Sequence, residues 1–371
     1  MRVKLKDIFD LQMGKTPSRS NLEYWNTTDY KWISIADLTK TSKYIFETKE
    51  YLSKSAIKDS GIKVIPANTV VMSFKLSIGK TAITKEDMYS NEAIMAFKDK
   101  HVINIIPEYI FYLFKYKNWE ECSNKAVMGK TLNKATLSEI EVEICSIEKQ
   151  RQIVNILDKI MSAVDGRKQE LQLLDELIKA RFVEMFGDPV KNPKGWEVVT
   201  IGDIVTEVRY GTSKPAVEGG KYPYLRMNNL TADGHLDLND LKYIDIPDDE
   251  IEKCVVRKGD VLFNRTNSIE LVGKTVVFDL QEDMIIAGYI IRVRLNKRLL
   301  PEILSQYMNL EALKDILRSM AKGAVNQANI NAQELQSIKV YIPDMELQKQ
   351  FIEMKNQVDK SKFDTMTFAP I

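Results

Sequence analysis

Three Gly-Lys-Thr triplets are the residues whose types and spacing first suggest chemistry, because this triplet closes the phosphate-binding loop of many nucleotide-binding enzymes. They begin at Gly79, Gly129 and Gly273. A phosphate-binding loop also needs a glycine five residues before the triplet. Those three positions hold Phe74, Asn124 and Ser268. The sequence therefore predicts no nucleotide-binding loop at any of the three triplets.

Other catalytic patterns are also missing from the sequence. The eleven prolines are nowhere adjacent, so the Asn/Asp-Pro-Pro-aromatic loop of amino-methyltransferases is absent, and no Gly-x-Gly-x-x-Gly fingerprint occurs. The histidines and cysteines, His101, His235, Cys122, Cys145 and Cys254, follow no metal-binding or redox spacing. We therefore expect no catalytic residue, no bound cofactor and no metal site, and predict that the chain is not itself an enzyme.

The elements that could position binding residues are arranged as an internal repeat of about 195 residues. Five segments recur in the same order along the chain. The pairs are Leu5–Ile8 with Ile201–Ile204, Tyr30–Thr39 with Tyr222–Thr231, Ile78–Thr81 with Val272–Thr275, Pro107–Glu108 with Pro301–Glu302, and Leu132–Gln152 with Ile330–Gln350. Each copy mixes short β-rich runs with helical stretches and scattered turns, which is an α+β pattern. We expect two similar mixed α/β domains, over 1–145 and 199–343.

A long helix is expected between the two domains, over 146–186. This segment has no proline and one glycine, and its apolar residues follow a heptad spacing. About 38 helical residues would reach roughly 57 Å. A shorter stripe over 344–371 predicts a second helix, antiparallel to the first in a coiled coil, and 187–198 is a linker. The predicted core of this helix pair is Ile153, Leu157, Ile160, Val164, Leu171, Leu174, Ile178, Phe351, Met354 and Val358.

Composition and charge set broader limits. The apolar fraction of 44% is typical of a protein with buried cores, and no apolar run is long enough to span a membrane. The amino-terminal residues do not resemble a signal peptide, and the sparse cysteines suit a reducing compartment, so we expect a cytoplasmic protein. The net charge of +1 does not by itself indicate nucleic acid, since dedicated DNA binders are often strongly basic.

Taken together, the repeat, the paired heptad helices and the phrase from Phe186-Gly187-Asp188-Pro189 to Lys194-Gly195-Trp196 resemble the specificity subunits of type I restriction-modification systems. Each half also opens with a Leu/Ile-x-Asp-Ile phrase, which Lys15-Thr16-Pro17-Ser18 or Gly211-Thr212-Ser213 follows. The resemblance covers essentially the whole chain. It implies two target-recognition domains, each of which reads one half of a split double-stranded DNA sequence in the major groove.

The resemblance also implies the partners. The long helices would act as a spacer and as the docking surface for two DNA adenine methyltransferase subunits, which carry S-adenosylmethionine, with a motor-nuclease restriction subunit as an optional further partner. Major-groove half-sites on one face of DNA lie about 34–36 Å apart, so a rod of roughly 57 Å minus the domain attachments has the right order of length. The second helix is shorter than the first, which departs from the family pattern.

Polar residues in the matched loops are the candidates for DNA contact. Arginine reads guanine edges and asparagine or glutamine reads adenine edges, whereas lysines and hydroxyls more often hold phosphates. In the first half the candidates are Lys15, Thr16, Ser18, Lys75, Lys80, Lys130 and Asn133. In the second half they are Thr212, Ser213, Lys214, Arg226, Asn228, Asn229, Arg265, Asn267, Lys274, Asn326, Gln327 and Asn329. The alternatives to a DNA-recognition subunit are a stand-alone DNA-modifying enzyme and a two-domain protein-binding scaffold.

Overall fold

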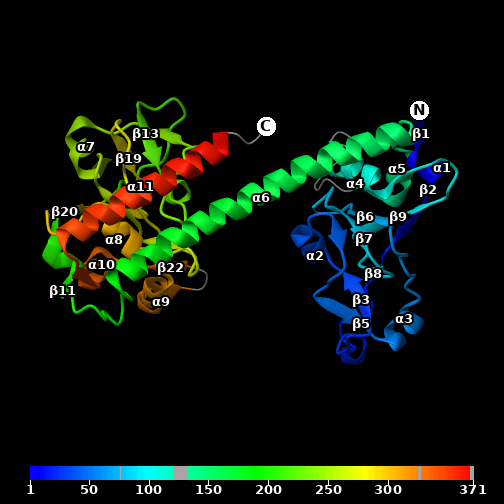
Figure 1. The fold of residues 1–371 in the computed structure, drawn as a ribbon, viewed down its shortest axis with the longest axis horizontal. Coiled ribbons are helices and arrows are strands. Elements are labelled where there is room, and N and C mark those ends of the chain that lie inside the picture. Colours follow the sequence, from blue (N-terminus) through cyan, green and yellow to red (C-terminus); the bar gives the residue numbers. More distant parts are fainter. Residues whose placement is uncertain (76, 120–131, 325–326, 368–371) are drawn as a thin grey trace. The chain divides into compact units, whose positions relative to one another are not determined.

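The computed structural model describes residues 1–75, 77–119, 132–324 and 327–367 (Figure 1). The chain divides into two compact units, unit 1 over Met1–Val164 and unit 2 over Asp165–Ile371. Helix α6 (Ile147–Phe186) contributes residues to both units and contains 40 residues. The long helix that the heptad pattern predicts is therefore confirmed, and the mixed α/β class of both units agrees with the expected fold.

Unit 1 is a mixed α/β structure that precedes and includes the first part of α6. Its elements are β1 (Arg2–Lys4), α1 (Leu5–Ile8), β2 (Phe9–Met13), η1 (Leu22–Tyr24), β3 (Tyr30–Ile33), α2 (Ile35–Lys40), β4 (Tyr44–Ile45), β5 (Glu50–Leu52), α3 (Lys54–Ser60), β6 (Val70–Ser73), β7 (Thr81–Thr84), β8 (Tyr89–Ser90), β9 (Ile94–Asp99), α4 (Pro107–Lys115), α5 (Lys134–Glu139) and β10 (Glu141–Glu143).

Two sheets organise unit 1. One has the strand order β2-β9-β6-β7-β4 and the other has the order β5-β3-β8, while β1 pairs with β10. All four residues of β6 are buried, which fits a short strand with two β-branched valines at the centre of a sheet. Helix α4 begins with Pro107 in its first turn, where a proline costs no hydrogen bond, and packs against β6 and β7.

Unit 2 repeats this plan with additional elements. These are β11 (Glu197–Thr200), η2 (Ile201–Ile204), β12 (Val205–Tyr210), β13 (Tyr222–Leu225), η3 (Met227–Asn229), β14 (Lys242–Ile244), α7 (Asp248–Cys254), β15 (Val255–Val256), β16 (Val261–Asn264), β17 (Thr266–Asn267), β18 (Thr275–Val277), β19 (Met284–Ile286), β20 (Ile290–Leu295), α8 (Pro301–Met308), α9 (Glu311–Met320), β21 (Lys322–Ala324), β22 (Gln327–Asn329), α10 (Ala332–Ser337), β23 (Lys339–Ile342) and α11 (Met345–Thr367).

The sheet orders show that the sequence repeat is also a structural repeat. The order β12-β20-β16-β18 in unit 2 matches β2-β9-β6-β7 in unit 1, and β11·β23 matches β1·β10. A second sheet, β14-β13-β19-β15, corresponds to β5-β3-β8. Strand β13 pairs antiparallel with β14 and parallel with β19, as β3 pairs antiparallel with β5 and parallel with β8. The small sheet β17-β22-β21 completes unit 2.

A buried glutamine joins each terminal helix to its unit. In unit 2 the Gln348 side chain accepts a hydrogen bond from the Leu300 N–H at 2.9 Å and donates to the Pro343 carbonyl at 2.9 Å. In unit 1 Gln150 accepts from the Ile106 N–H at 3.0 Å and donates to the Cys145 carbonyl at 3.0 Å. Both glutamines are fully buried. Glu148-Lys149-Gln150 and Glu346-Leu347-Gln348 are matching parts of the sequence repeat, and their glutamines attach each helix to its domain.

Within unit 2, α11 packs antiparallel to the second part of α6. The ring centres of Phe182 and Phe351 lie 5.2 Å apart, and Lys362 Nζ lies 2.5 Å from Asp175 Oδ1, so rising numbers on α11 meet falling numbers on α6. Phe182, Phe351 and Ile178 belong to the core of unit 2. The antiparallel helix pair is thus confirmed in this unit.

The heptad stripe of α6 packs against different partners along the helix. Ile153 and Leu157 pack against the hydrophobic core of unit 1, and Ile178 lies in the core of unit 2. Ile160 is 40% exposed, so its placement in a helix-pair core was wrong. Val164, Leu171 and Leu174 are half-buried, and Met354 and Val358 pack on the unit 2 core. A single stripe satisfies two different cores because α6 belongs to both units.

The described part of the chain lacks two features, a membrane-spanning helix and a metal-binding cluster. None of its helices is long and apolar enough to cross a membrane. Among the same residues, no group of three or more His, Cys, Asp or Glu side chains is placed to hold a metal ion.

Candidate DNA interface

The loop after β2 of unit 1, which carries several candidate DNA contacts, is held close to the turn between β8 and β9. The Gly14 and Lys15 N–H groups donate to the carbonyls of Ile94 at 3.1 Å and Ser90 at 2.8 Å. A Cβ atom at Gly14 would lie 2.2 Å from the carbonyl oxygens of Ser90 and Asn91. Only glycine therefore allows this approach of the two segments.

Unit 2 holds the matching loop in the same way. The Gly211 and Thr212 N–H groups donate to the carbonyls of Ile290 at 3.1 Å and Ile286 at 2.9 Å. A Cβ atom at Gly211 would lie 2.2 Å from the Ile286 carbonyl oxygen. A glycine in the same place of each repeat is a signal in the sequence that marks this loop.

A second pair of hydrogen bonds completes the common backbone frame. The Phe74 N–H donates to the Ala93 carbonyl in unit 1, and the Arg265 N–H donates to the Tyr289 carbonyl in unit 2, both at 2.9 Å. The backbone is thus shared while the side chains at matching positions differ in size and charge. A shared frame with different side chains can present different hydrogen-bonding groups to different DNA sequences.

Candidate residues of unit 1 gather around Glu92. The Thr16 hydroxyl donates a hydrogen bond to the Glu92 carboxylate and is the main cause that lowers the pKa of Glu92. Lys75 and Arg19 lie near enough to lower the same pKa further by their charges. Residues from two loops distant in the sequence, Thr16 and Lys75, are therefore brought together around Glu92.

Arg19 is a member of this cluster that the sequence analysis missed. Its guanidinium carbon lies 3.7 Å from the ring centre of Trp25 and 4.9 Å from that of Trp32. Its Nη2 also donates to Glu50 at 3.1 Å. Stacked, paired arginines are held in a defined orientation, which suits recognition of a planar or charged group. The nearby sequence signal for this stacking was Trp25, six residues after Arg19.

In unit 2 the corresponding cluster centres on Arg265. Its Nη1 donates to the Gly288 carbonyl at 3.3 Å, and its guanidinium carbon lies 5.1 Å from the Tyr210 ring centre. The Gly288 N–H in turn donates to the Thr212 carbonyl at 2.7 Å. Tyr210 and Tyr289, which were not predicted, expose 43% and 50% of their surface beside this arginine. Thr212 and Arg265 are therefore neighbours, although far apart in the sequence.

Other candidates of unit 2 already have partners within the protein. Lys214 Nζ lies 2.8 Å from Glu250, and Arg226 Nη2 lies 2.8 Å from Asp240. Asn229 is 2% exposed, and its amide donates to the Asp237 carbonyl and accepts from the Arg226 N–H. Asn267 donates to Asn264, and Asn329 accepts from Thr266 across β17 and β22. Ser213 and Asn228 are exposed.

The two lysines of the repeated Gly-Lys-Thr phrase are placed differently. Lys80 is half-buried and donates to the Thr39 hydroxyl at 2.7 Å. Lys274 is 7% exposed and donates to the carbonyls of Met227 and Leu230. Burial lowers the pKa of Lys274. The prediction that Lys274 binds phosphate is contradicted by this placement, because its ammonium is enclosed and engaged by main-chain oxygens.

The remaining candidates lie in unit 1 and in or beside the β17-β22-β21 sheet. The Lys15 ammonium donates to the Ser60 carbonyl, Ser18 bonds Ser20 at 2.8 Å, and Lys75 Nζ lies 5.4 Å from the Phe74 ring centre. Asn133 caps α5 by accepting from the Thr136 N–H at 2.9 Å. Lys130 and Asn326 lie outside the described residues, and Gln327 is placed only as backbone of β22.

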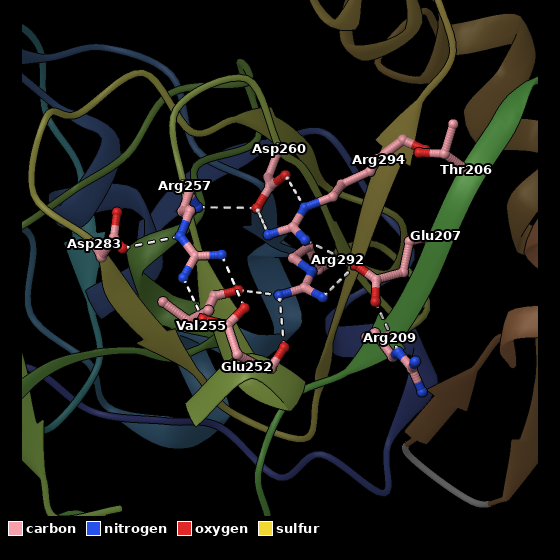
Figure 2. A network of polar contacts seen from close by, with 10 residues as sticks. All are labelled: Thr206, Glu207, Arg209, Glu252, Val255, Arg257, Asp260, Asp283, Arg292 and Arg294. Atoms are coloured by element: carbon pink, nitrogen blue, oxygen red, sulfur yellow. Dashed lines mark hydrogen bonds and ion pairs between the residues drawn. The ribbon is translucent and has the colours of Figure 1, made fainter. Parts of the chain in front are cut away.

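A network of charged side chains, in which Arg292 and Asp260 are buried, joins strands of unit 2 (Figure 2). Arg292 on β20 is fully buried, its Nη2 lies 2.7 Å from Glu207, and its guanidinium also donates to the Val255 carbonyl. Burial is the main cause that lowers the pKa of Arg292. Arg292 faces Leu262 in the ladder where unit 1 has Ala96 facing Val71. Arg292 therefore braces unit 2 from within, and its burial removes it from base reading.

Comparisons with known proteins agree on one family. The sequence model of the family described as type I restriction modification DNA specificity domain matches residues 1–176 and 193–368. The chain is 30% identical over 250 residues to the type I restriction enzyme MjaIX specificity subunit of Methanocaldococcus jannaschii. This match covers 61% of this chain and 57% of that protein. It is 26% identical over 259 residues to the EcoKI specificity subunit of Escherichia coli, with 66% and 56% covered. These matches span less than two thirds of either relative.

Solved structures show the same fold. A chain from a study of complex assembly and conformational transition in the type I R-M system matches with a TM-score of 0.59 and 18% identity, over 100% of this chain and 93% of that one. The type I restriction-modification S subunit from M. genitalium matches with a TM-score of 0.50 and 14% identity, over 99% and 91%.

Proposed function

The chain belongs to the family of the type I restriction modification DNA specificity domain, and from that premise we propose that it is the sequence-specific DNA-binding subunit of a type I restriction-modification enzyme. Each unit reads one half of a two-part target in double-stranded DNA. The chain itself performs no catalysis and directs the modifying subunits to that target.

The observation that carries this proposal is the common backbone frame with different side chains. Glycine holds the loop at Gly14 and Gly211 in the same way, while Phe74 is replaced by Arg265 and Ala93 by Tyr289. An enzyme that used one site twice would need the same groups in both copies. Two reading heads for two different half-sites need a retained frame and altered contacts.

The proposed partners follow from the family and from the helices. Two DNA adenine methyltransferase subunits dock on α6 and α11 and hold the S-adenosylmethionine, and a motor-nuclease subunit joins them when the system restricts DNA. The exposed faces of α6, which include Ile156, Leu173 and Leu177, offer apolar contact area for such subunits. The assembly acts in the cytoplasm, where the cell's DNA is accessible.

Methylome sequencing tests the proposal. Cells would carry this chain, or its variants, together with its methyltransferase subunit. Arg265→Ala is expected to relax or alter the half of the methylated motif that unit 2 reads. Lys75→Ala is expected to affect only the half that unit 1 reads. Arg298→Ala, which removes another surface arginine of unit 2, is the matched control. A motif unchanged in both halves by Arg265→Ala and Arg265→Lys, at full methylation, would contradict the assignment.

Two measurements separate the alternatives. Purified chain alone should neither methylate nor cleave DNA, whereas a stand-alone enzyme would do so. Its DNA mobility shift should weaken as salt rises, because phosphate contacts release counterions. A protein-binding scaffold would give no salt-dependent shift.

A further inference from the structure

The turn between β8 and β9 of unit 1 has the same length as the turn between β19 and β20 of unit 2. Each turn lies between two carbonyls that accept from the loop at Gly14 or Gly211, which are those of Ser90 and Ile94 in unit 1 and of Ile286 and Ile290 in unit 2. Three residues separate the two carbonyls in both units. The structural repeat therefore places Glu92 and Gly288, the middle residues, at the same position.

The charge around this position is reversed between the two units. Unit 1 exposes the carboxylate of Glu92 there. Unit 2 has no side chain at Gly288, and the guanidinium of Arg265 donates to the Gly288 carbonyl at 3.3 Å. The residue of unit 1 that matches Arg265 is Phe74, because their N–H groups donate to matching carbonyls of the two turns. One unit thus presents a hydrogen-bond acceptor where the other presents donors.

The Glu92 side chain is ionised and held in one orientation. The Thr16 hydroxyl donates to its Oε2 atom. This hydrogen bond is the main cause that lowers the pKa of Glu92, so the group is a carboxylate at neutral pH and can only accept hydrogen bonds. Thr16 engages one of the two oxygens, and a carboxylate accepts several hydrogen bonds at once. Thr16 therefore orients Glu92 without using up its capacity to accept.

The two cations near Glu92 have other contacts within unit 1. The Arg19 guanidinium makes two hydrogen bonds to the Glu50 carboxylate, one of them at 3.1 Å from Nη2. Lys75 Nζ lies 5.4 Å from the Phe74 ring centre. Among the described residues, no lysine or arginine forms an ion pair with Glu92. The Glu92 carboxylate is therefore available to a donor from outside the chain.

A fixed carboxylate in a DNA interface restricts the base that it can meet. In the major groove guanine and thymine present acceptors, and adenine presents its N6 amino donor beside the N7 acceptor. Cytosine presents only its N4 amino donor. Because an ionised carboxylate has no hydrogen to donate, it is repelled by every one of those acceptors and by the phosphates. Cytosine is therefore the base whose edge is complementary to Glu92.

We propose that Glu92 determines specificity in unit 1 by accepting a hydrogen bond from the N4 amino group of a cytosine in the half-site of that unit. Thr16 is the positioning residue that aims the carboxylate at this base. Unit 2 has Arg265 at the matching place, where its donors suit guanine. The inference rests on the proposed function and extends it, because it names a base that one reading head selects.

Methylome sequencing of cells that carry the chain with its methyltransferase subunit tests the inference. Arg265→Ala, which alters the half-site of unit 2, identifies the half-site of unit 1 as the other one. That half-site should contain a fixed C·G pair. Glu92→Gln should broaden this position to C·G or A·T, because an amide also pairs with adenine N6 and N7. Glu92→Ala should accept any base there, whereas Glu141→Gln, which removes another exposed carboxylate of unit 1, should leave the motif unchanged.

Competition binding of the purified complex measures the size of the effect. A duplex with A·T in place of the fixed C·G pair should bind the original complex about tenfold more weakly, within the range that one base pair contributes. The Glu92→Gln complex should bind both duplexes about equally. Thr16→Val should reduce the discrimination and Thr16→Ser should retain it, because the hydroxyl and not the shape of the side chain orients Glu92.

The inference is overturned if the half-site of unit 1 contains no fixed C·G pair, or if Glu92→Ala and Glu92→Gln both keep that pair fixed at full methylation. Glu92→Gln preserves the shape of the side chain and decides the test should Glu92→Ala bind DNA too weakly. Failure of the proposed function gives a different result, since the unaltered chain would then direct methylation to no two-part motif at all.

Discussion

Replacing Gln348 with alanine should detach α11 from its unit. The side chain accepts from the Leu300 N–H at 2.9 Å and donates to the carbonyls of Arg298 at 3.2 Å and Pro343 at 2.9 Å, and it is fully buried. Gln348→Ala leaves the Leu300 N–H and the carbonyls of Arg298 and Pro343 without their hydrogen-bond partner. At about 1–3 kcal/mol for each buried group left unsatisfied, and with partial relief by water, we expect a loss of about 3 kcal/mol.

Hydrogen exchange followed by mass spectrometry can place this loss in the chain. Amides of α8 and α11 should exchange with an opening free energy lowered by about 3 kcal/mol, because they belong to the cooperative unit that Gln348 holds together. Amides of α4 and β6 should keep their protection. Gln150→Ala is the matched variant and should show the reverse pattern, since Gln150 makes the same attachment in unit 1.

The attachment role of Gln348 would be refuted by a loss below about 1 kcal/mol at α11, since removing three hydrogen bonds of a buried side chain should cost more than that. It would also fail if either variant lowered protection equally in both units. That result would mean that the two glutamines stabilise one cooperative structure and not two separate attachments.

Three further predictions follow from placement and charge. Lys80→Ala should lower the salt slope of DNA binding by about one unit, whereas Lys274→Ala should leave the slope unchanged and lower the stability of unit 2, because Lys274 is enclosed. Burial lowers the pKa of Lys314 to about 8 from 10.5, so the unfolded chain binds more protons between these values and the free energy of unfolding of unit 2 should rise with pH across that window, but not in Lys314→Met. Four residues inserted near Gly166 lengthen a helix by about 6 Å, close to two base pairs, so the gap between half-sites should grow by one or two base pairs.

Each of these has a clear opposing result. DNA mobility shifts over a salt series measure the slopes, and a lowered slope for Lys274→Ala would restore it as a phosphate contact. Urea unfolding at several pH values compares the chain with Lys314→Met, and parallel curves would contradict the low pKa. Methylome sequencing reads the gap, and an unchanged gap at full methylation would show that α6 is not the spacer.

Local patterns in the sequence were sufficient for the architecture. The heptad spacing predicted the helix that the structure places over Ile147–Phe186, because helical periodicity is a property of neighbouring residues. The ordered repeat predicted two similar mixed units, since matching segments build matching sheets. Gln150 and Gln348 lie within the repeated segments, although their role in attaching the helices was visible only in the structure.

Only the tertiary structure decided what each side chain contacts. Lys80 and Lys274 occupy the same repeated phrase, yet different packing beneath them leaves one half-buried at a hydroxyl and encloses the other. Ile160 follows the heptad stripe but faces solvent, because α6 changes partners along its length. Periodicity specifies which face of a helix a residue lies on, whereas burial depends on what segments distant in sequence place against that face.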